Sequence, residues 1–289
     1  MGTSTLWSFI FPGSASSRMR CWCIEICRDT IVLGAKYGVE WGKGIPIPTT
    51  WRIWDLDVDE PIVLFPFREL IGGLLWIAFL TRLDIENAVR AVARYCSVPK
   101  MVYWKAALGI LGYAVRTSSF GITYQRGTAV EGFHLISFAD ADHASSCMDR
   151  SSVSGEVEMF AGGPVLWHSK TQKCVTLSTT QAEYVDMSAM GKEILFLRQV
   201  WCFMLPKARM PYIAMYEDNE GAIQIAKHLI SNSNSKHIDV RHHFLRELVE
   251  RKEIEIIPVA SQYQHADFLT KALPEREFEF HRGIVMSVM

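Results

Sequence analysis

The stretch FHLISFAD at residues 133–140 decides the fold of the second half of the chain. Its side chains alternate between two faces, and Asp140 shares its face with apolar residues. A period of two is typical of a β-strand. Two more strand-like runs follow at residues 153–160 and 165–170, with Gly-Gly-Pro between them, a composition that favours a hairpin turn. The sequence therefore predicts a meander of three strands.

Helical spacing replaces the strand pattern beyond residue 178. Apolar side chains recur every three to four positions from Met187 to Met204, and Ser178 can cap this helix. Further along, the patterns predict a strand at 212–217, helices at 220–228 and 237–251, a strand at 253–259 and a helix at 264–273. This succession of strands and helices indicates an α/β fold.

The first 130 residues have a different character. Residues 1–57 show no sustained period, so we assign them no fold. Helical apolar spacing predicts a mainly helical connector over residues 58–130, with helices at 69–79, 85–95 and 103–116. We therefore divide the chain into an unassigned segment at 1–57, a connector at 58–130 and an α/β domain at 131–289.

The composition excludes several classes of protein. The chain of 289 residues has 30 basic and 31 acidic side chains and is 49% apolar, which is typical of a globular protein and not of a disordered tail. Its seven cysteines form no C-x-x-C pair, so a zinc ribbon is not indicated. No apolar run reaches the roughly 18–20 residues of a membrane span, and the first residues lack the basic region of a signal peptide. We expect an intracellular, cytoplasmic protein.

Four acidic residues occupy positions where a fold seldom places an unpaired charge. Asp140 ends a predicted strand on its covered face, and Glu183 lies within the apolar stripe of the following helix. Asp218 directly follows a strand, and Asp267 lies early in the last helix. Buried carboxylates repel one another or take up protons, whereas two divalent ions about 3.5–4 Å apart remove the repulsion and support phosphoryl transfer. The pattern therefore predicts a site for Mg²⁺, with Mn²⁺ as a substitute.

A purely structural interpretation exists for each acid taken singly. Glu183 can be stabilised by the positive end of its helix, and Asp218 can cap the helix that it precedes. Four acids in this order of elements favour the metal site over this alternative.

Several short motifs resemble those of a known family. In the α/β domain they are FADAD at 138–142, SVSG at 152–155, LSTTQAEY at 177–184, EDN at 217–219, SKHIDVRHHF at 235–244 and ADFLTK at 266–271. In the connector they are FRELIG at 67–72, TRLDI at 81–85 and WKAA at 104–107. The first set resembles the ribonuclease H domain of copia-type retrotransposon Pol polyproteins, and the second resembles the end of their reverse transcriptase.

The resemblance implies an RNase H-like fold, with a mixed five-stranded sheet flanked by helices. It also implies metal-dependent hydrolysis of the RNA strand of RNA/DNA hybrids, with Asp140, Glu183, Asp218 and Asp267 as catalytic residues and ligands of two Mg²⁺ ions. The rest of a Pol polyprotein is an expected partner, and a virus-like particle is the family's cytoplasmic setting. The chain has no Tyr-x-Asp-Asp, so polymerase activity is not expected.

The alternative hypothesis is a decayed or co-opted element fragment that folds or binds nucleic acid without catalysis. Residues 1–57, which match the family poorly, favour this alternative for the chain as a whole. Retention of all four carboxylates favours the enzyme. A third possibility, a DDE-type integrase, would need a different acidic spacing and a basic tail.

Basic and aromatic side chains near the predicted site are candidates for binding the nucleic-acid backbone. These candidates are Trp167, Lys170, Lys173, Lys236, Arg241 and Arg246. The alternatives are core packing for Trp167 and a solvated helix face for the basic residues around 236–246. His265, two residues before Asp267, is a candidate for assisting proton transfer.

Overall fold

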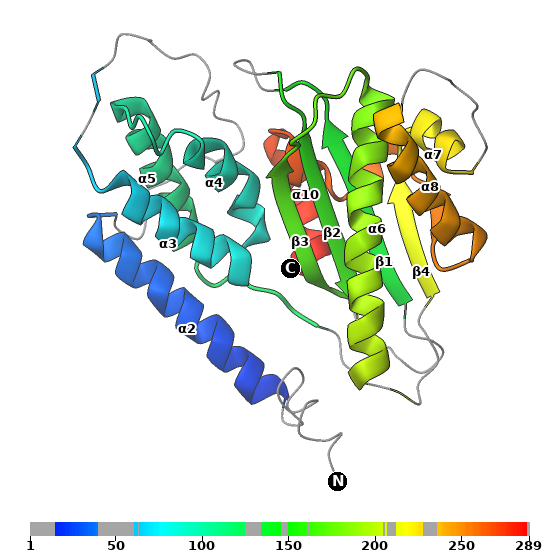
Figure 1. The fold of residues 1–289 in the computed structure, drawn as a ribbon. Helices are drawn as coiled ribbons and strands as arrows, with labels where there is room; N and C mark the ends of the chain where they lie inside the picture. Colours follow the sequence, from blue (N-terminus) through cyan, green and yellow to red (C-terminus); the bar gives the residue numbers. More distant parts are fainter. Residues whose placement is uncertain are drawn as a thin grey trace. The chain divides into compact units, whose positions relative to one another are not determined.

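The computed structural model describes residues 15–39, 61–62, 64–124, 134–145, 150–160, 162–204, 206, 212–227 and 236–287. The chain divides into two compact units (Figure 1). One unit comprises the described residues of Tyr124–Thr270, and the other comprises those of Phe11–Thr123 and Lys271–Met289.

A mixed sheet of five strands, in the order β3-β2-β1-β4-β5, forms the centre of the first unit. The strands are β1 (His134–Asp142), β2 (Val153–Phe160), β3 (Gly163–Thr171), β4 (Tyr212–Glu217) and β5 (Glu255–Pro258). The first three form an antiparallel meander, while β4 pairs in parallel with both β1 and β5. The sheet and its flanking helices confirm the predicted fold class.

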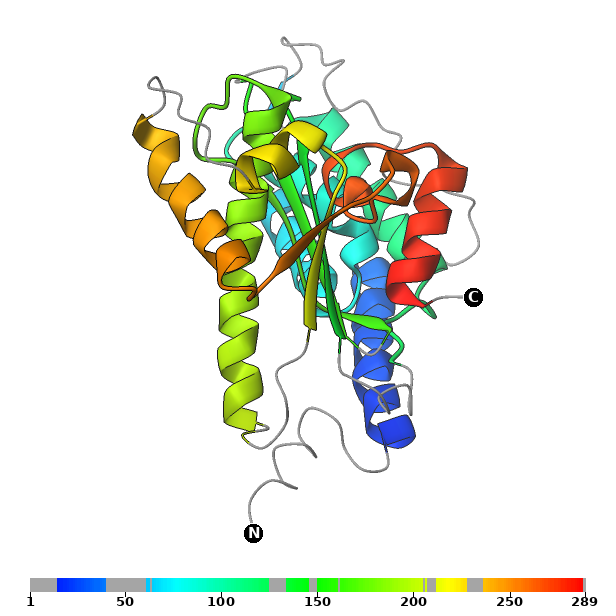
Figure 2. The same ribbon diagram turned by 90° about the vertical axis from the view of Figure 1, so that its right-hand side faces the viewer.

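One face of this sheet is covered by the long helix α6 (Thr179–Met204), as Figures 1 and 2 show. Alternate apolar residues of β1 and β4 pack against a stripe on α6, and α7 (Glu220–Lys227) and α8 (Lys236–Glu250) extend the same core. The core side chains include Leu135, Ala139, Ile213 and Met215 from the strands and Met187, Met190 and Ile194 from α6. The predicted 3–4 residue spacing therefore marks the buried face of α6 correctly.

The helix predicted at 264–273 is too long. The structure has a 3₁₀ turn at Ser261–Tyr263 and a single helical turn, α9 (Asp267–Thr270). Gln264 lies between them with an extended backbone, and its side-chain amide donates to the carbonyl of Ala139 at 2.8 Å. This bond holds the segment against β1 and explains why a continuous helix does not form.

The second unit is helical. It contains α2 (Ala15–Lys36), α3 (Phe67–Leu80), a 3₁₀ turn at Leu83–Ile85, α4 (Glu86–Ala93), α5 (Met101–Arg116) and α10 (Glu275–Met286). Helix α2 lies within the segment to which the sequence analysis assigned no fold. Helix α10 packs with this unit, although the sequence analysis placed it in the domain at 131–289.

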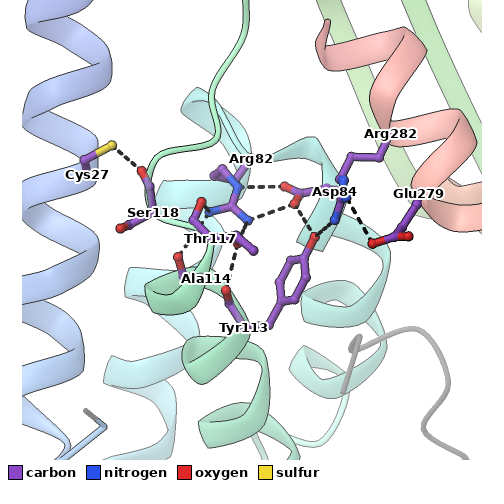
Figure 3. A network of polar contacts seen from close by, with 9 residues as sticks. All are labelled: Cys27, Arg82, Asp84, Tyr113, Ala114, Thr117, Ser118, Glu279 and Arg282. Atoms are coloured by element: carbon purple, nitrogen blue, oxygen red, sulfur yellow. Dashed lines mark hydrogen bonds and ion pairs between the residues drawn. The ribbon is translucent and has the colours of Figure 1, made fainter. Parts of the chain in front are cut away.

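A buried polar network joins these helices (Figure 3). Arg82 makes two 2.8 Å contacts to the carboxylate of Asp84, which also accepts a 2.9 Å hydrogen bond from the Tyr113 hydroxyl. The same hydroxyl accepts a 2.8 Å bond from Arg282 of α10, and Phe278 of α10 is fully buried. This shared network and apolar contact explain why α10 belongs to the helical unit.

Among the described residues, none of the helices combines the length and the apolar character that a membrane span requires.

Candidate metal centre

The structure brings three of the four predicted carboxylates together. Oxygen atoms of Asp140, Glu183 and Asp218 lie within 4.8 Å of one another. Asp140 and Glu183 are buried, and Asp218 is half-buried. Such a group of hard oxygen ligands suits a divalent cation such as Mg²⁺.

The topology of the sheet explains this meeting. Asp140 and Asp218 each lie two residues beyond the last pair of the parallel ladder between β1 and β4, so both lie at the carboxyl-terminal edge of this pair of strands. Helix α6 begins at this edge, and Glu183 lies in its first turns. There the backbone N–H of Ala141 donates to Glu183 Oε2 at 2.7 Å. Three segments distant in sequence thus converge at one end of β1.

Several acidic side chains lie close together at this centre. Burial is the largest cause that raises the pKa of Glu183 to about 11, and the nearby carboxylates of Asp140, Glu217, Asp186 and Asp218 account for the rest of the increase. Glu183 would therefore bind a proton at neutral pH unless another positive charge took its place. A divalent cation is the ligand that this environment favours.

Glu217 is a component of the centre that the sequence analysis did not select. It is the last residue of β4 and is fully buried. Its Oε1 accepts a 2.9 Å hydrogen bond from the backbone N–H of Asn219, and burial raises its pKa well above the usual range. The sequence signal was its place immediately before Asp218 in the motif EDN.

Asp267 does not belong to the group of three described above. It begins α9, whose last residue, Thr270, donates its hydroxyl hydrogen to Asp140 Oδ2. His265, which precedes α9, is buried with its ring 4.9 Å from that of Phe138 in an edge-to-face contact. The segment that carries Asp267 therefore lies against β1, next to the centre.

A second set of buried acids lies under α6 and was also missed. Glu156 and Glu158 of β2 are 3% and 0% exposed, and Asp186 of α6 is 0% exposed. Burial raises the pKa of Glu156 to about 7 and that of Glu158 to about 8. The alternation of β2 could have placed both glutamates on one face, but it could not show that this face is buried, as the whole strand from Val153 to Met159 is.

The side chain of His143 contacts two hydroxyl groups. Its Nδ1 lies 3.3 Å from Thr176 Oγ1 and 3.4 Å from Ser152 Oγ, and these two hydroxyls are 2.8 Å apart. The contacts tie the end of β1 to the loop that leads into α6. They support the two elements that carry Asp140 and Glu183.

Retrovirus-related Pol polyproteins of plant transposons match three quarters of this chain. The chain is 33% identical over 220 residues to the Pol polyprotein from transposon TNT 1-94 of Nicotiana tabacum. This match covers 76% of the chain and 16% of that protein. It is 31% identical over 219 residues to the Pol polyprotein from transposon RE2 of Arabidopsis thaliana, and this match covers 75% of the chain and 15% of that protein. Over three quarters of its length the chain is similar to copia-type Pol polyproteins.

The chain spans only about one sixth of the length of these Pol relatives, 16% and 15% respectively. No family model matches it. Among solved structures, RNase H1 from the halophilic archaeon Halobacterium salinarum is 18% identical, with a TM-score of 0.33, and the match covers 47% of this chain and 94% of that one.

The described nucleic-acid-binding candidates do not all share one face. Trp167 and Lys170 are three residues apart on β3, so their side chains point to opposite faces of the sheet. Lys170 and Lys173 are exposed, whereas Arg246 is buried beside Tyr184. The side chains of Lys236 and Arg241 lie outside the described residues.

Proposed function

We propose that this chain is a metal-dependent ribonuclease that hydrolyses the RNA strand of RNA/DNA hybrids. The observation that carries the proposal is the group of Asp140, Glu183 and Asp218 oxygens within 4.8 Å of one another. Similarity to Pol polyproteins supports it, because the motifs that resemble the RNase H domain of these polyproteins include all three of these residues.

The residues present fit a divalent cation. All donors are carboxylate oxygens, which suit Mg²⁺ or Mn²⁺, and the raised pKa of Glu183 reflects a site that needs positive charge. Asp140, Glu183 and Asp218 would hold the metal, and we propose Asp267 as a fourth ligand of a two-ion site. When bound, two such ions stabilise the attacking water and the departing 3′ oxygen of a phosphodiester.

The chain's own contacts prepare these ligands. The N–H of Ala141 holds one oxygen of Glu183, and Thr270 holds one oxygen of Asp140. Selection of the RNA strand would depend on its 2′-hydroxyl groups, with little reading of base sequence. Exposed Lys170 and Lys173 are the described basic residues that we propose for phosphate contacts.

DNA synthesis is not part of the proposal. The 289 residues contain no Tyr-x-Asp-Asp. We propose that any polymerase activity resides in other parts of a Pol polyprotein, which would then be the partner of this chain.

The test is cleavage of a hybrid with separately labelled RNA and DNA strands by the full chain in Mg²⁺ or Mn²⁺. We expect cutting of the RNA strand alone, abolished by EDTA and by Asp218→Asn, and unchanged in the matched control Glu250→Gln, whose carboxylate is exposed on α8. A folded chain that binds Mn²⁺ but cuts neither strand would overturn the proposal. That result would favour the alternative of a fragment without catalytic activity.

A further inference from the structure

Asp140 is contacted from α9 by a buried hydroxyl group. Thr270 is 4% exposed and Asp140 is 0% exposed, and Thr270 Oγ1 donates to Asp140 Oδ2. An ionised carboxylate can only accept hydrogen bonds, so this contact turns one oxygen of Asp140 toward α9 and orients the other away from it. The hydroxyl thereby limits the rotation of a carboxylate that is a proposed ligand.

The close packing of α9 on β2 makes this contact possible. Gly155 pairs with Asp140 across the β1–β2 ladder. A Cβ atom at position 155 would lie 2.5 Å from Thr270 Cγ2 and 3.1 Å from the carbonyl oxygen of Ala266. Only glycine lets α9 approach this closely, and the approach brings the Thr270 hydroxyl to the level of Asp140.

Further bonds hold α9 in place independently of Asp140. The hydroxyl of Ser169 on β3 donates to the carbonyl of Leu269 at 2.5 Å, and the Gln264 side chain donates to the carbonyl of Ala139 at 2.8 Å. Both donors are buried. The position of Thr270 is therefore set by the sheet as a whole.

The Thr270 hydroxyl has one hydrogen and two acceptors within reach. Besides Asp140 Oδ2, the carbonyl oxygen of Asp267 lies 3.0 Å from Thr270 Oγ1. An ionised carboxylate is the stronger acceptor of the two, because charge-assisted hydrogen bonds are about twice as strong as neutral ones. The hydrogen is thus directed to Asp140 when that residue carries its charge.

We infer that Thr270 is a positioning residue that fixes Asp140 for the divalent cation. The inference rests on the proposed function, since it concerns the same metal centre. Groups that orient metal ligands in this way typically contribute a factor of about 10–100 to metal affinity or activity. Thr270 thus couples α9, which carries Asp267, to the ligand at the end of β1.

The experiment compares Thr270→Val, Thr270→Ser and the matched control Ser169→Ala in the full chain. Valine keeps the shape and removes the hydroxyl, whereas serine keeps the hydroxyl. Ser169→Ala removes another buried hydroxyl that bonds to α9 without contacting Asp140. Mn²⁺ binding is measured by calorimetry without nucleic acid, and the thermal midpoint of each variant is measured in EDTA.

We expect Mn²⁺ affinity to fall by about 10-fold or more in Thr270→Val and to stay within about 3-fold of the parent in Thr270→Ser and Ser169→Ala. Equal affinity of Thr270→Val and the parent would overturn the inference. An equal loss in Ser169→Ala would also overturn it, because the loss would then reflect general loosening of α9. Parent protein that binds Mn²⁺ but cuts no hybrid would contradict the proposed function and leave this comparison of affinities intact.

Discussion

Glu158 makes the stability of the sheet unit depend on pH. Its side chain is fully buried under α6, and neither carboxylate oxygen has a hydrogen-bond partner among the described residues. Burial, together with the negative charges of Glu156 and Glu193, raises its pKa to about 8. Three other charged or titratable groups lie near Glu156 and Glu158. They are Asp186 on α6 and His168 and Lys170 on β3.

The sign of the effect follows from the two pKa values. The pKa of Glu158 is about 8 in the folded chain and near its ordinary value of 4.5 in the unfolded chain. Between these values the unfolded chain releases a proton that the folded chain keeps, so stability falls as pH rises, by about 1.4 kcal/mol per pH unit. From about pH 5 to about pH 7.5 the loss from this one residue is about 3 kcal/mol, and it levels off above about pH 8.

The variant Glu158→Gln isolates this contribution. An amide has nearly the shape of the protonated acid and is neutral at every pH, while all other acids remain the same in both proteins. We expect the variant to match the parent near pH 5 and to exceed it by about 3 kcal/mol near pH 7.5, which is about 6–12 °C in thermal midpoint for a unit of this size. Glu250→Gln, with its exposed side chain, should follow the parent throughout.

The assay is thermal unfolding in EDTA across this pH range. The transition of the sheet unit is identified as the one that added Mn²⁺ shifts. Parallel pH profiles for the parent and Glu158→Gln would refute the reasoning, since Glu158 would then be ionised in the folded chain or solvated there.

Three further outcomes test other parts of the structure. Asp84→Ala should destabilise the helical unit by about 3–5 kcal/mol in denaturant unfolding, because it leaves the buried guanidinium of Arg82 without its counter-ion. A loss of stability below about 1 kcal/mol would contradict this role of the ion pair. Gly155→Ala should cost about 1–3 kcal/mol in the sheet unit by the same measurement, since its Cβ would crowd Thr270, and an unchanged midpoint would show that α9 can move away. Mn²⁺ at about 100 times its Kd should stabilise the sheet unit by about 2.7 kcal/mol, and Asp218→Asn at the same Mn²⁺ concentration should show a much smaller rise in thermal midpoint.

Local patterns in the chain predicted most of the sheet unit. The alternation at 133–140 marks β1, and the spacing of Met187, Met190 and Ile194 marks the buried face of α6. Both patterns reflect how a single strand or helix presents its side chains, which depends only on the local backbone. The order of these elements and the family motifs were enough to select Asp140, Glu183 and Asp218, which the structure brings together.

The tertiary structure alone decided which distant residues meet. The contact between Thr270 and Asp140 joins residues 130 positions apart, and it depends on the absence of a side chain at Gly155. In the same way, packing placed Glu158 on a buried face and α10 in the helical unit. Periodicity shows which side chains of a helix or strand share an apolar face, but the residues that cover this face come from elsewhere in the chain. For this reason the ligands of the proposed site could be predicted from the sequence, whereas the contacts that orient and electrostatically tune them could not.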